Sequence, residues 1–338
     1  RRFGVTAKHS IEKKAAANSD AFLTVSGITA TECRYLLGHE VDVVTPNGFE
    51  DDFVPKGSTF TGKRKRARSV MLNVANKLLG TNLGDDTLII GTSGRYEFKN
   101  KGIDVFLESL NRLCRDKNLK RDVLAFVNVP GWVGDPREDL QARLKSKDKF
   151  DTPLEVPFIT HWLHNMTHDQ VLDMLKYLGM SNHPEDKVKV IFVPCYLNGR
   201  DGILNKDYYD LLLGQDLSVY PSYYEPWGYT PLESVAFRVP TITTDLAGFG
   251  LWVKSLKKQN GIDGGVEVLH RSDYNYSEVA DGIKDTVSLF SAKTENEVKE
   301  IRKHAAEIAE KALWKHFIKY YYEAYDIALR NAMKRQLN

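Results

Sequence analysis

Short apolar runs alternate with amphipathic segments through most of the chain. The runs are four to eight residues long and rich in Val, Ile, Leu and Phe, at 87–91, 122–129, 188–193, 217–220, 239–243 and 266–269. Runs of this length and composition are typical of strands buried on both faces. Helical periodicity fills the segments between them, at 102–115, 209–213, 234–238, 251–257 and 277–290. The alternation predicts an α/β fold, a Rossmann-like and mostly parallel sheet with helices on both faces.

The amino-terminal part predicts a helix, a strand, a helix and a strand, at 11–17, 21–25, 28–37 and 41–44. Ser26-Gly27 signals the start of the second helix. The last strand runs into Thr45-Pro46-Asn47-Gly48, a turn sequence that we interpret as a hinge.

The carboxyl-terminal part predicts a long helical region at 295–333. Six aromatic residues cluster in it, namely Trp314, Phe317, Tyr320, Tyr321, Tyr322 and Tyr325. A helix with that many aromatic side chains is expected to pack against a partner domain or a second subunit, as in a homo-oligomer.

The loop that follows the run at 217–220 has the chemistry of an anion site. The tetrapeptide Thr-Pro-Leu-Glu at 230–233 predicts a helix start, with Thr230 as the N-cap and proline at the first helical position. The backbone amides of Gly228, Tyr229 and Thr230 would then face a phosphate bound at the amino end of the helix. Gly228 would let the backbone come close to it.

Two acids flank this turn. Glu225 precedes a proline between Tyr224 and Trp227, where an unpartnered carboxylate would be costly, so we expect it to line a cleft. Glu233 could line the same cleft, but it stands three residues after Thr230 and could equally do nothing more than close a capping box. The spacing leaves both interpretations of Glu233 open.

A second loop, at 94–102, follows the run at 87–91. It carries Arg95 and Lys101, two cations that could clamp a diphosphate at another carboxyl end of the sheet. For so loose a spacing, ordinary surface charge is the alternative. The loop is not a P-loop, and the Gly-Phe-Gly at 248–250 lacks the third glycine of a dinucleotide fingerprint, which disfavours a nicotinamide dehydrogenase.

Two other polar clusters have structural interpretations. The basic run at 63–68 could face an anion or a polysaccharide, but a solvated helix start is favoured. His161, His164 and His168 would share one face if they were helical, yet no acid stands near them at ligand spacing. We therefore predict neither a metal site nor a bound cofactor.

The composition disfavours a nucleic-acid-binding, a disulfide-bonded and a membrane-spanning protein. A net charge of +2 over 338 residues argues against nucleic acid as the main partner. The three cysteines, Cys33, Cys114 and Cys195, have neither disulfide nor metal spacing and suggest reduced thiols of a cytoplasmic protein. There is no apolar run long enough to span a membrane. The chain begins at Arg1 without methionine, so we expect it to be a piece of a longer polypeptide.

The string at 223–233, Tyr-Tyr-Glu-Pro-Trp-Gly-Tyr-Thr-Pro-Leu-Glu, resembles the signature of the animal and fungal type of glycogen synthase. That family (glycosyltransferase family 3) consists of retaining glycosyltransferases with two Rossmann lobes, the GT-B fold. Further matching blocks extend the resemblance over essentially the whole chain, at 24–30, 44–48, 94–108, 188–192 and 240–250.

The resemblance implies a function. Members transfer glucose from UDP-glucose to the non-reducing end of an α-1,4-glucan, with retention of configuration and no metal. It assigns Arg95 and Lys101 to the donor phosphates together with the amides at 228–230, and Tyr208 to the uracil. Glu225 and Glu233 match the paired acids, the first beside the reacting centre, where its role as nucleophile or electrostatic stabiliser stays open.

The resemblance also implies a domain organisation. Residues 1–40 match a remnant of the amino-terminal lobe and the hinge, 41–292 the nucleotide-sugar domain, and 293–338 a helical tail that packs back on the partner lobe. Most of the amino-terminal lobe is absent, so we expect this fragment alone to bind nucleotide without turnover.

One departure concerns regulation. The family carries an arginine-rich helix that senses glucose 6-phosphate. The corresponding stretch at 295–310 holds five glutamates among Lys299, Arg302 and Lys303. So many acids should repel an anion, and on that ground we expect no activation by glucose 6-phosphate.

Two alternatives remain at this stage. One is another GT-B glucosyltransferase, such as an enzyme that uses ADP-glucose. The other is a non-catalytic module that binds nucleotide or glucan, which the presence of both Glu225 and Glu233 disfavours.

Overall fold

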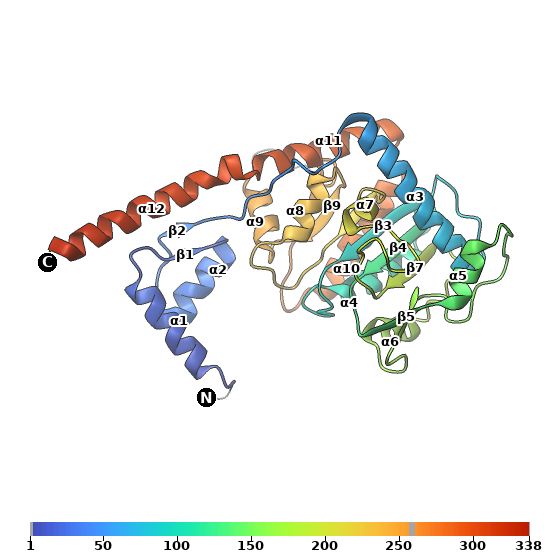
Figure 1. Ribbon diagram of the computed structural model, residues 1–338, viewed down its shortest axis with the longest axis horizontal. Coiled ribbons are helices and arrows are strands. Elements are labelled where there is room, and N and C mark those ends of the chain that lie inside the picture. Colours follow the sequence, from blue (N-terminus) through green and yellow to red (C-terminus); the bar gives the residue numbers. More distant parts are fainter. Residues whose placement is uncertain (1–2, 257–260, 338) are drawn as a thin grey trace.

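A six-stranded parallel sheet forms the centre of the computed structural model, which describes residues 3–256 and 261–337 (Figure 1). The strands lie in the order β10-β9-β8-β3-β4-β7 across the sheet. Their bounds are β3 (Leu88–Ser93), β4 (Val123–Asn128), β7 (Val188–Val193), β8 (Leu217–Val219), β9 (Thr241–Thr244) and β10 (Val266–Leu269). All neighbouring pairs are parallel, so the predicted sheet is confirmed.

The strand order reverses between β3 and β8. From β3 the chain moves outward through β4 to β7, returns to β8 on the other side, and moves outward again to β10. In open α/β sheets, ligands bind outside the carboxyl ends of the strands at such a reversal. The fold therefore places the loops after β3 and β8 at the expected ligand crevice.

Helices cover both faces of the sheet, as predicted. Every residue of β3, β4 and β7 is buried, which explains why these strands show no alternation of apolar and polar positions. The face that carries Ile90 packs against α4 (Ile103–Cys114), α6 (Gln170–Tyr177) and α10 (Tyr276–Ser291). The face that carries Ile89 packs against α3 (Gly57–Leu79), α5 (Glu138–Lys145) and α7 (Tyr208–Leu212).

A third apolar cluster lies beside β9 and β10. It joins α8 (Tyr229–Ala236), α9 (Gly248–Ser255) and α11 (Glu295–Lys311) to the start of α12 (Trp314–Leu337). Trp227 and Phe317 pack edge to face within it, with ring centroids 6.0 Å apart. Part of the predicted carboxyl-terminal aromatic cluster thus packs inside the chain itself, while Tyr322 and Tyr325 remain exposed.

The amino-terminal residues form a separate small unit. Its elements are α1 (Thr6–Asn18), β1 (Leu23–Thr24), α2 (Gly27–Glu32), a π-helical turn (Cys33–Leu37) and β2 (Val43–Val44). β1 pairs with β2 in parallel, and Ser26 caps α2, as its sequence predicts. Because β1 and β2 pair across residue 41, the small sheet joins both sides of the predicted boundary.

The long helix α12 leaves the core and returns to this small unit (Figure 1). Near its end, Arg335 donates two hydrogen bonds to the Asp20 carboxylate, at 2.7 and 2.9 Å. Asn331 donates to the Asp20 carbonyl at 2.9 Å. The carboxyl-terminal tail therefore bridges the Rossmann core and the amino-terminal unit.

The segment between β4 and β7 carries a small insertion. Two short strands, β5 (Val133–Pro136) and β6 (His161–Leu163), pair in antiparallel fashion. Arg137 anchors them, because its fully buried guanidinium binds the Asp139 carboxylate and the carbonyls of Glu155, Val156 and Ile159.

Two sequence predictions need correction here. The basic run at 63–68 is not simply solvated, since Arg64 and Arg68 turn inward and pair with Asp216 at 2.5 and 2.7 Å. The helical region at 295–333 is two helices, broken between Lys311 and Trp314. Residue 257, the predicted end of α9, lies outside the described residues.

Among the helices the structure describes, none has the length and hydropathy that a membrane span requires.

Candidate donor-substrate site

The loops after β3 and β8 lie against each other at the strand reversal. The Tyr223 amide donates to the Asn100 carbonyl at 2.8 Å. Gly102, with φ of +67°, lies so close to Pro221 that a Cβ atom there would stand 2.1 Å from the Pro221 carbonyl oxygen. Only glycine fits this contact, which locks the two loops together.

Lys101 and Glu225 meet where these loops join. The Lys101 ammonium forms an ion pair and hydrogen bond with Glu225 Oε2, and the two side chains are only 13% and 18% exposed. The Glu225 backbone is also fixed, since its amide donates to Leu246 and its carbonyl accepts from Gly248, at 3.1 and 3.0 Å. The structure therefore brings together two of the predicted site residues from positions 124 apart in the chain.

The turn that leads into α8 differs in one respect from the prediction. The helix begins at Tyr229, with Gly228 as its N-cap at φ of +110° and without a side-chain cap. Thr230 is therefore not the N-cap, and the capping-box interpretation of Glu233 is wrong. The amides at 228–230 do lie in the first turn, where helix geometry leaves N–H groups without intrahelical partners. A Cβ at Gly228 would stand 3.6 Å from Glu225 Cγ, so the turn lies directly over that acid.

Glu233 contacts a neighbouring tyrosine instead. Tyr209 donates its hydroxyl to Glu233 Oε1 at 2.9 Å. Its ring stacks on Phe237, with centroids 5.0 Å apart and planes 5° from parallel. Burial raises the pKa of Glu233, and the Tyr209 hydrogen bond opposes part of that rise. Tyr209 thus fixes the position of this half-buried carboxylate.

Tyr208, the other tyrosine of α7, reaches the carboxyl end of β3. Its hydroxyl lies 2.8 Å from Ser93 Oγ at the end of β3, and Ser93 also donates to the Tyr220 hydroxyl at 3.4 Å. Burial raises the pKa of Tyr208 well above its usual value, so the phenol stays protonated. This hydroxyl cluster joins the carboxyl ends of β3 and β8.

Arg95 is placed differently from the other predicted residues. Its side chain is 74% exposed and pairs with Glu97 at 2.8 Å, on the same loop as Lys101. It therefore has no anchor in the crevice, although it stands at the carboxyl edge of the sheet.

The three histidines of the sequence pattern do not lie on a helix. His161 lies in β6, while His164 and His168 lie in the following loop, so the three do not share a helical face. His161, Cys195 and Asp201 do come together, with potential ligand atoms within 4.8 Å of one another. Two of them are otherwise engaged, because His161 Nε2 bonds the Asp201 carbonyl, and the Asp201 carboxylate accepts three backbone amides. Burial also raises the pKa of the Cys195 thiol to about 12.

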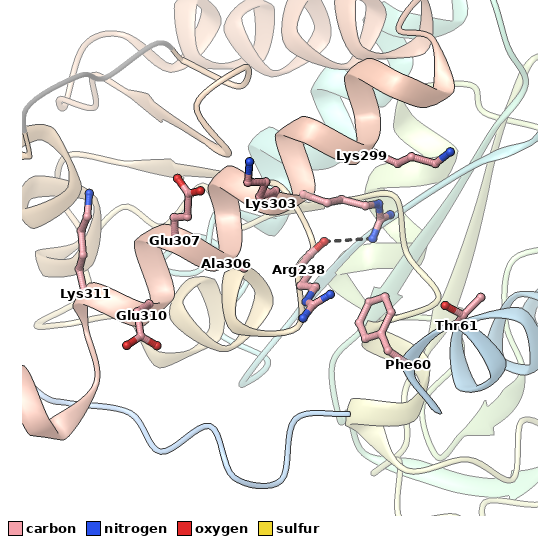
Figure 2. A pocket seen from close by; sticks show the side chains of 10 residues that line it. Phe60, Thr61, Arg238, Lys299, Lys303, Ala306, Glu307, Glu310 and Lys311 are labelled. Atoms are coloured by element: carbon pink, nitrogen blue, oxygen red, sulfur yellow. Dashed lines mark hydrogen bonds between the residues drawn. The ribbon is translucent and has the colours of Figure 1, made fainter. Parts of the chain in front are cut away.

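The helix α11 borders a cavity of about 750 Å³ near the start of α3 (Figure 2). Five cations line it, Arg238, Lys299, Arg302, Lys303 and Lys311, against two acids, Glu307 and Glu310. The argument that acids on this helix would repel an anion is therefore wrong for the face that borders the cavity. Arg302 itself donates to the Arg238 carbonyl at 3.0 Å, the dashed line in Figure 2.

Sequence reasoning did not single out Tyr209, Ser93 or Tyr220. Tyr209 stands next to Tyr208 in a helix start, and pattern alone cannot say which of the two faces an acid 24 residues away. Ser93 and Tyr220 end two apolar strands. Their position at carboxyl ends beside the strand reversal was the available signal.

Known proteins resemble this chain in sequence. A family model described as "Glycogen synthase" matches residues 2–136 and 139–338. The glycogen [starch] synthase of Neurospora crassa is 29% identical over 394 residues, covering 99% of this chain and 55% of the relative. The liver enzyme of Mus musculus is 31% identical over 302 residues, covering 73% and 42%. The chain thus spans about half the length of the curated relatives it matches.

Solved structures share the fold. Sucrose-phosphate synthase from Thermosynechococcus elongatus gives a TM-score of 0.53 at 16% identity, covering 98% of this chain and 61% of that one. HepE from Anabaena, solved in complex with UDP and glucose, gives 0.52 at 15% identity, covering 98% and 67%. At these identities the similarity supports the GT-B type of fold.

Proposed function

The chain belongs to the glycogen synthase family, and from that premise we propose that it carries the donor-binding half of a retaining glucosyltransferase. The reaction transfers glucose from UDP-glucose to the non-reducing 4-hydroxyl of an α-1,4-glucan, with retention at the anomeric carbon. The observation that carries the proposal is the contact between Lys101 and Glu225 beneath the Gly228 turn, at the strand reversal.

The diphosphate would lie between this contact and the start of α8. Lys101 supplies one positive charge, and Arg95 can add a second from the same loop. The amides at 228–230 and the positive end of the helix dipole supply donors without intrahelical partners. Because Lys101 already neutralises Glu225, a bound diphosphate would share this ammonium with the acid.

Glu225 would then lie beside the anomeric carbon. A carboxylate there can displace UDP from the anomeric carbon to form a covalent glucosyl intermediate, which the acceptor hydroxyl then displaces, and the two displacements together give retention. Alternatively, it can stabilise the positive charge of an oxocarbenium-like state as UDP leaves, and retention then requires the acceptor hydroxyl to attack the face from which UDP departs. Glu233, fixed by Tyr209, would accept hydrogen bonds from donor hydroxyls, while Tyr208 would lie against the base.

The remainder of the enzyme would supply the acceptor side. Curated relatives are about twice as long, and α12 together with the amino-terminal unit offers the surface on which a second lobe would pack. The Anabaena protein solved with UDP-glucose supports a nucleotide-sugar ligand for this fold.

Calorimetry with UDP tests the donor site. The chain should bind UDP more tightly than ADP, and Lys101→Ala should weaken UDP binding by roughly 10- to 100-fold, because it removes a partly buried charge that contacts phosphate. Lys99→Ala, on the same loop, is the matched control. Equal affinity of the wild type and Lys101→Ala would exclude this site. Tighter binding of ADP would favour the ADP-glucose alternative.

A further inference from the structure

The insertion between β4 and β7 forms a second cavity beside the donor loop. It measures about 260 Å³ and is lined by Tyr96, Trp132, Leu163, Asn165, His168, Asp169 and Gln170. Tyr96 follows Arg95 directly, and Trp132 lies just beyond the carboxyl end of β4. The cavity therefore opens on the same edge of the sheet as the donor site, one strand away from the reversal.

Trp132 is unusual among the tryptophans because its side chain is 73% exposed. Its backbone is fixed, and its ring has one aromatic neighbour. It lies against His164 with centroids 5.1 Å apart, and its carbonyl accepts from the His164 amide at 3.0 Å. The preceding Gly131 donates to Pro194 at 2.9 Å. An exposed indole on a fixed backbone presents a flat apolar surface at small entropic cost on binding.

Polar groups surround this surface without being used inside the protein. Within the described residues, the side chains of Trp132, His168 and Gln170 form no hydrogen bond to the rest of the chain. By contrast, Asp169 is satisfied by Tyr96 and by two amides at the start of α6. The cavity thus combines one apolar platform with several free donors and acceptors, the arrangement that orients a small polar ligand.

The lining also indicates which ligand class fits. It contains no lysine or arginine and one carboxylate, so it disfavours a phosphate. A volume near 260 Å³ lies below the range of about 300–1,000 Å³ that is typical of sites for drug-sized ligands, and suits a single ring rather than a nucleotide. A neutral ring with hydroxyl groups on its edge and an apolar face matches these features, and a glucose unit is such a ring.

We propose that Trp132 and the cavity beside it form a glucan subsite, which holds one glucose unit of an α-1,4-glucan near the donor site. The glucose unit stacks on the indole, and its hydroxyl groups bond Gln170, His168 and the Asn165 amide. The choice of a glucan rests on the proposed function, which supplies the acceptor. The subsite raises the local concentration of chain ends without taking part in the transfer itself.

Calorimetry with maltoheptaose tests the subsite. Trp132→Ala should weaken binding by roughly 10-fold through loss of the stacking surface, and Gln170→Ala should weaken it by a few-fold. Tyr177→Ala is the matched control, because Tyr177 is 87% exposed at the end of α6 and does not line the cavity. UDP affinity and the thermal midpoint should stay unchanged in all three variants.

Several outcomes would overturn the proposal. They are the absence of maltoheptaose binding in the wild type, equal binding by Trp132→Ala, and a loss of UDP affinity in that variant, which would assign the cavity to the nucleotide. Glucosyl transfer by the intact enzyme is measured separately. Failure of transfer with maltoheptaose binding intact would reject the proposed function and leave the subsite standing.

Discussion

An ionic cluster lies at each end of strand β8, and the two clusters differ in how fully the carboxylate is used by partners within the protein. At its amino end, Asp216 is 5% exposed and pairs with Arg64, Arg68 and Arg302. It also accepts from the Ile89 amide, so its oxygens are fully used. At the carboxyl end, Glu225 has one cation, Lys101, beneath a turn whose amides have no partners within the helix.

The difference shows what each cluster does. The Asp216 cluster ties α3, β3 and α11 together around a buried charge, and the acceptor capacity of its carboxylate is used within the protein. The Glu225 pair joins two loops and retains capacity for further partners. Breaking a fully satisfied buried cluster should cost stability, whereas changing the open pair should cost function.

The largest effect is expected from Asp216→Asn. It leaves three arginines with no buried counter-charge, and we expect a loss of about 3–5 kcal/mol in the free energy of unfolding. Burial alone would raise the pKa of Asp216, but the three arginines lower it to about 2. Because its folded pKa lies below the unfolded value of about 3.9, this stabilisation is present above pH 4 and is lost as the pH falls towards 2.

Urea unfolding of both proteins between pH 2 and pH 7 provides the measurement. The gap between wild type and Asp216→Asn should be widest at neutral pH and should close in acid. A gap that does not change with pH would mean that the charge of Asp216 is not what stabilises the cluster.

Glu225→Gln should give the opposite result. We expect turnover by the intact enzyme to fall by about 10²–10³-fold, because the amide cannot stabilise positive charge at the anomeric centre. The midpoint of urea unfolding should change little, since glutamine has the same shape and can still accept a hydrogen bond from Lys101. Steady-state transfer from UDP-glucose is the assay. Unchanged turnover would favour the non-catalytic alternative.

Tyr209→Phe should have an intermediate effect. Removing one hydrogen bond to a carboxylate costs about 1.5–3 kcal/mol at most, so we expect a several-fold rise in KM for the donor. The Tyr209 hydroxyl opposes the burial that raises the pKa of Glu233, so its loss should raise this pKa further. If Glu233 acts as a carboxylate, the acid limb of the pH–rate profile should move to higher pH. A fixed acid limb would show that Glu233 does not set the profile.

The smallest effect is expected at Lys63, which belongs to the same basic run as Arg64 and Arg68. Lys63 pairs with Asp210 at 2.8 Å, but the two side chains are 38% and 32% exposed. Lys63→Ala should change the free energy of unfolding by less than about 1 kcal/mol, and added salt should reduce the difference. A loss of unfolding free energy as large as that of Asp216→Asn would contradict the view that the buried cluster, and not the exposed pair, stabilises the fold.

These clusters also show how far sequence patterns reach. The apolar runs predicted the strands because burial on both faces leaves a continuous signal, and the position of two loops at the carboxyl ends of strands predicted the crevice. The positions of charged residues in the sequence did not indicate which of them are buried. Arg64 and Lys63 are neighbours in one basic run, and their opposite environments depend on Asp216, which lies 152 residues from Arg64.

The sequence predicted residues of the candidate site but not the contacts between them. Glu225 and Lys101 were both expected at carboxyl ends, but their direct contact depends on the close approach of Gly102 to Pro221. Glu233 allowed two interpretations because a helix start can be capped by either Gly228 or Thr230. The Tyr209 hydroxyl that Glu233 binds comes from another helix, which local spacing cannot indicate.

The helix α12 makes contacts with two separate parts of the molecule near its two ends. Arg335 donates hydrogen bonds to Asp20 in the amino-terminal unit, and the Phe317 ring packs against Trp227, two residues from Glu225. These contacts are separated by about 27 Å at 1.5 Å per residue along a continuous helix. One helix therefore connects the amino-terminal unit to the loop of Glu225, through the Asp20 carboxylate at one end and the Trp227 ring at the other.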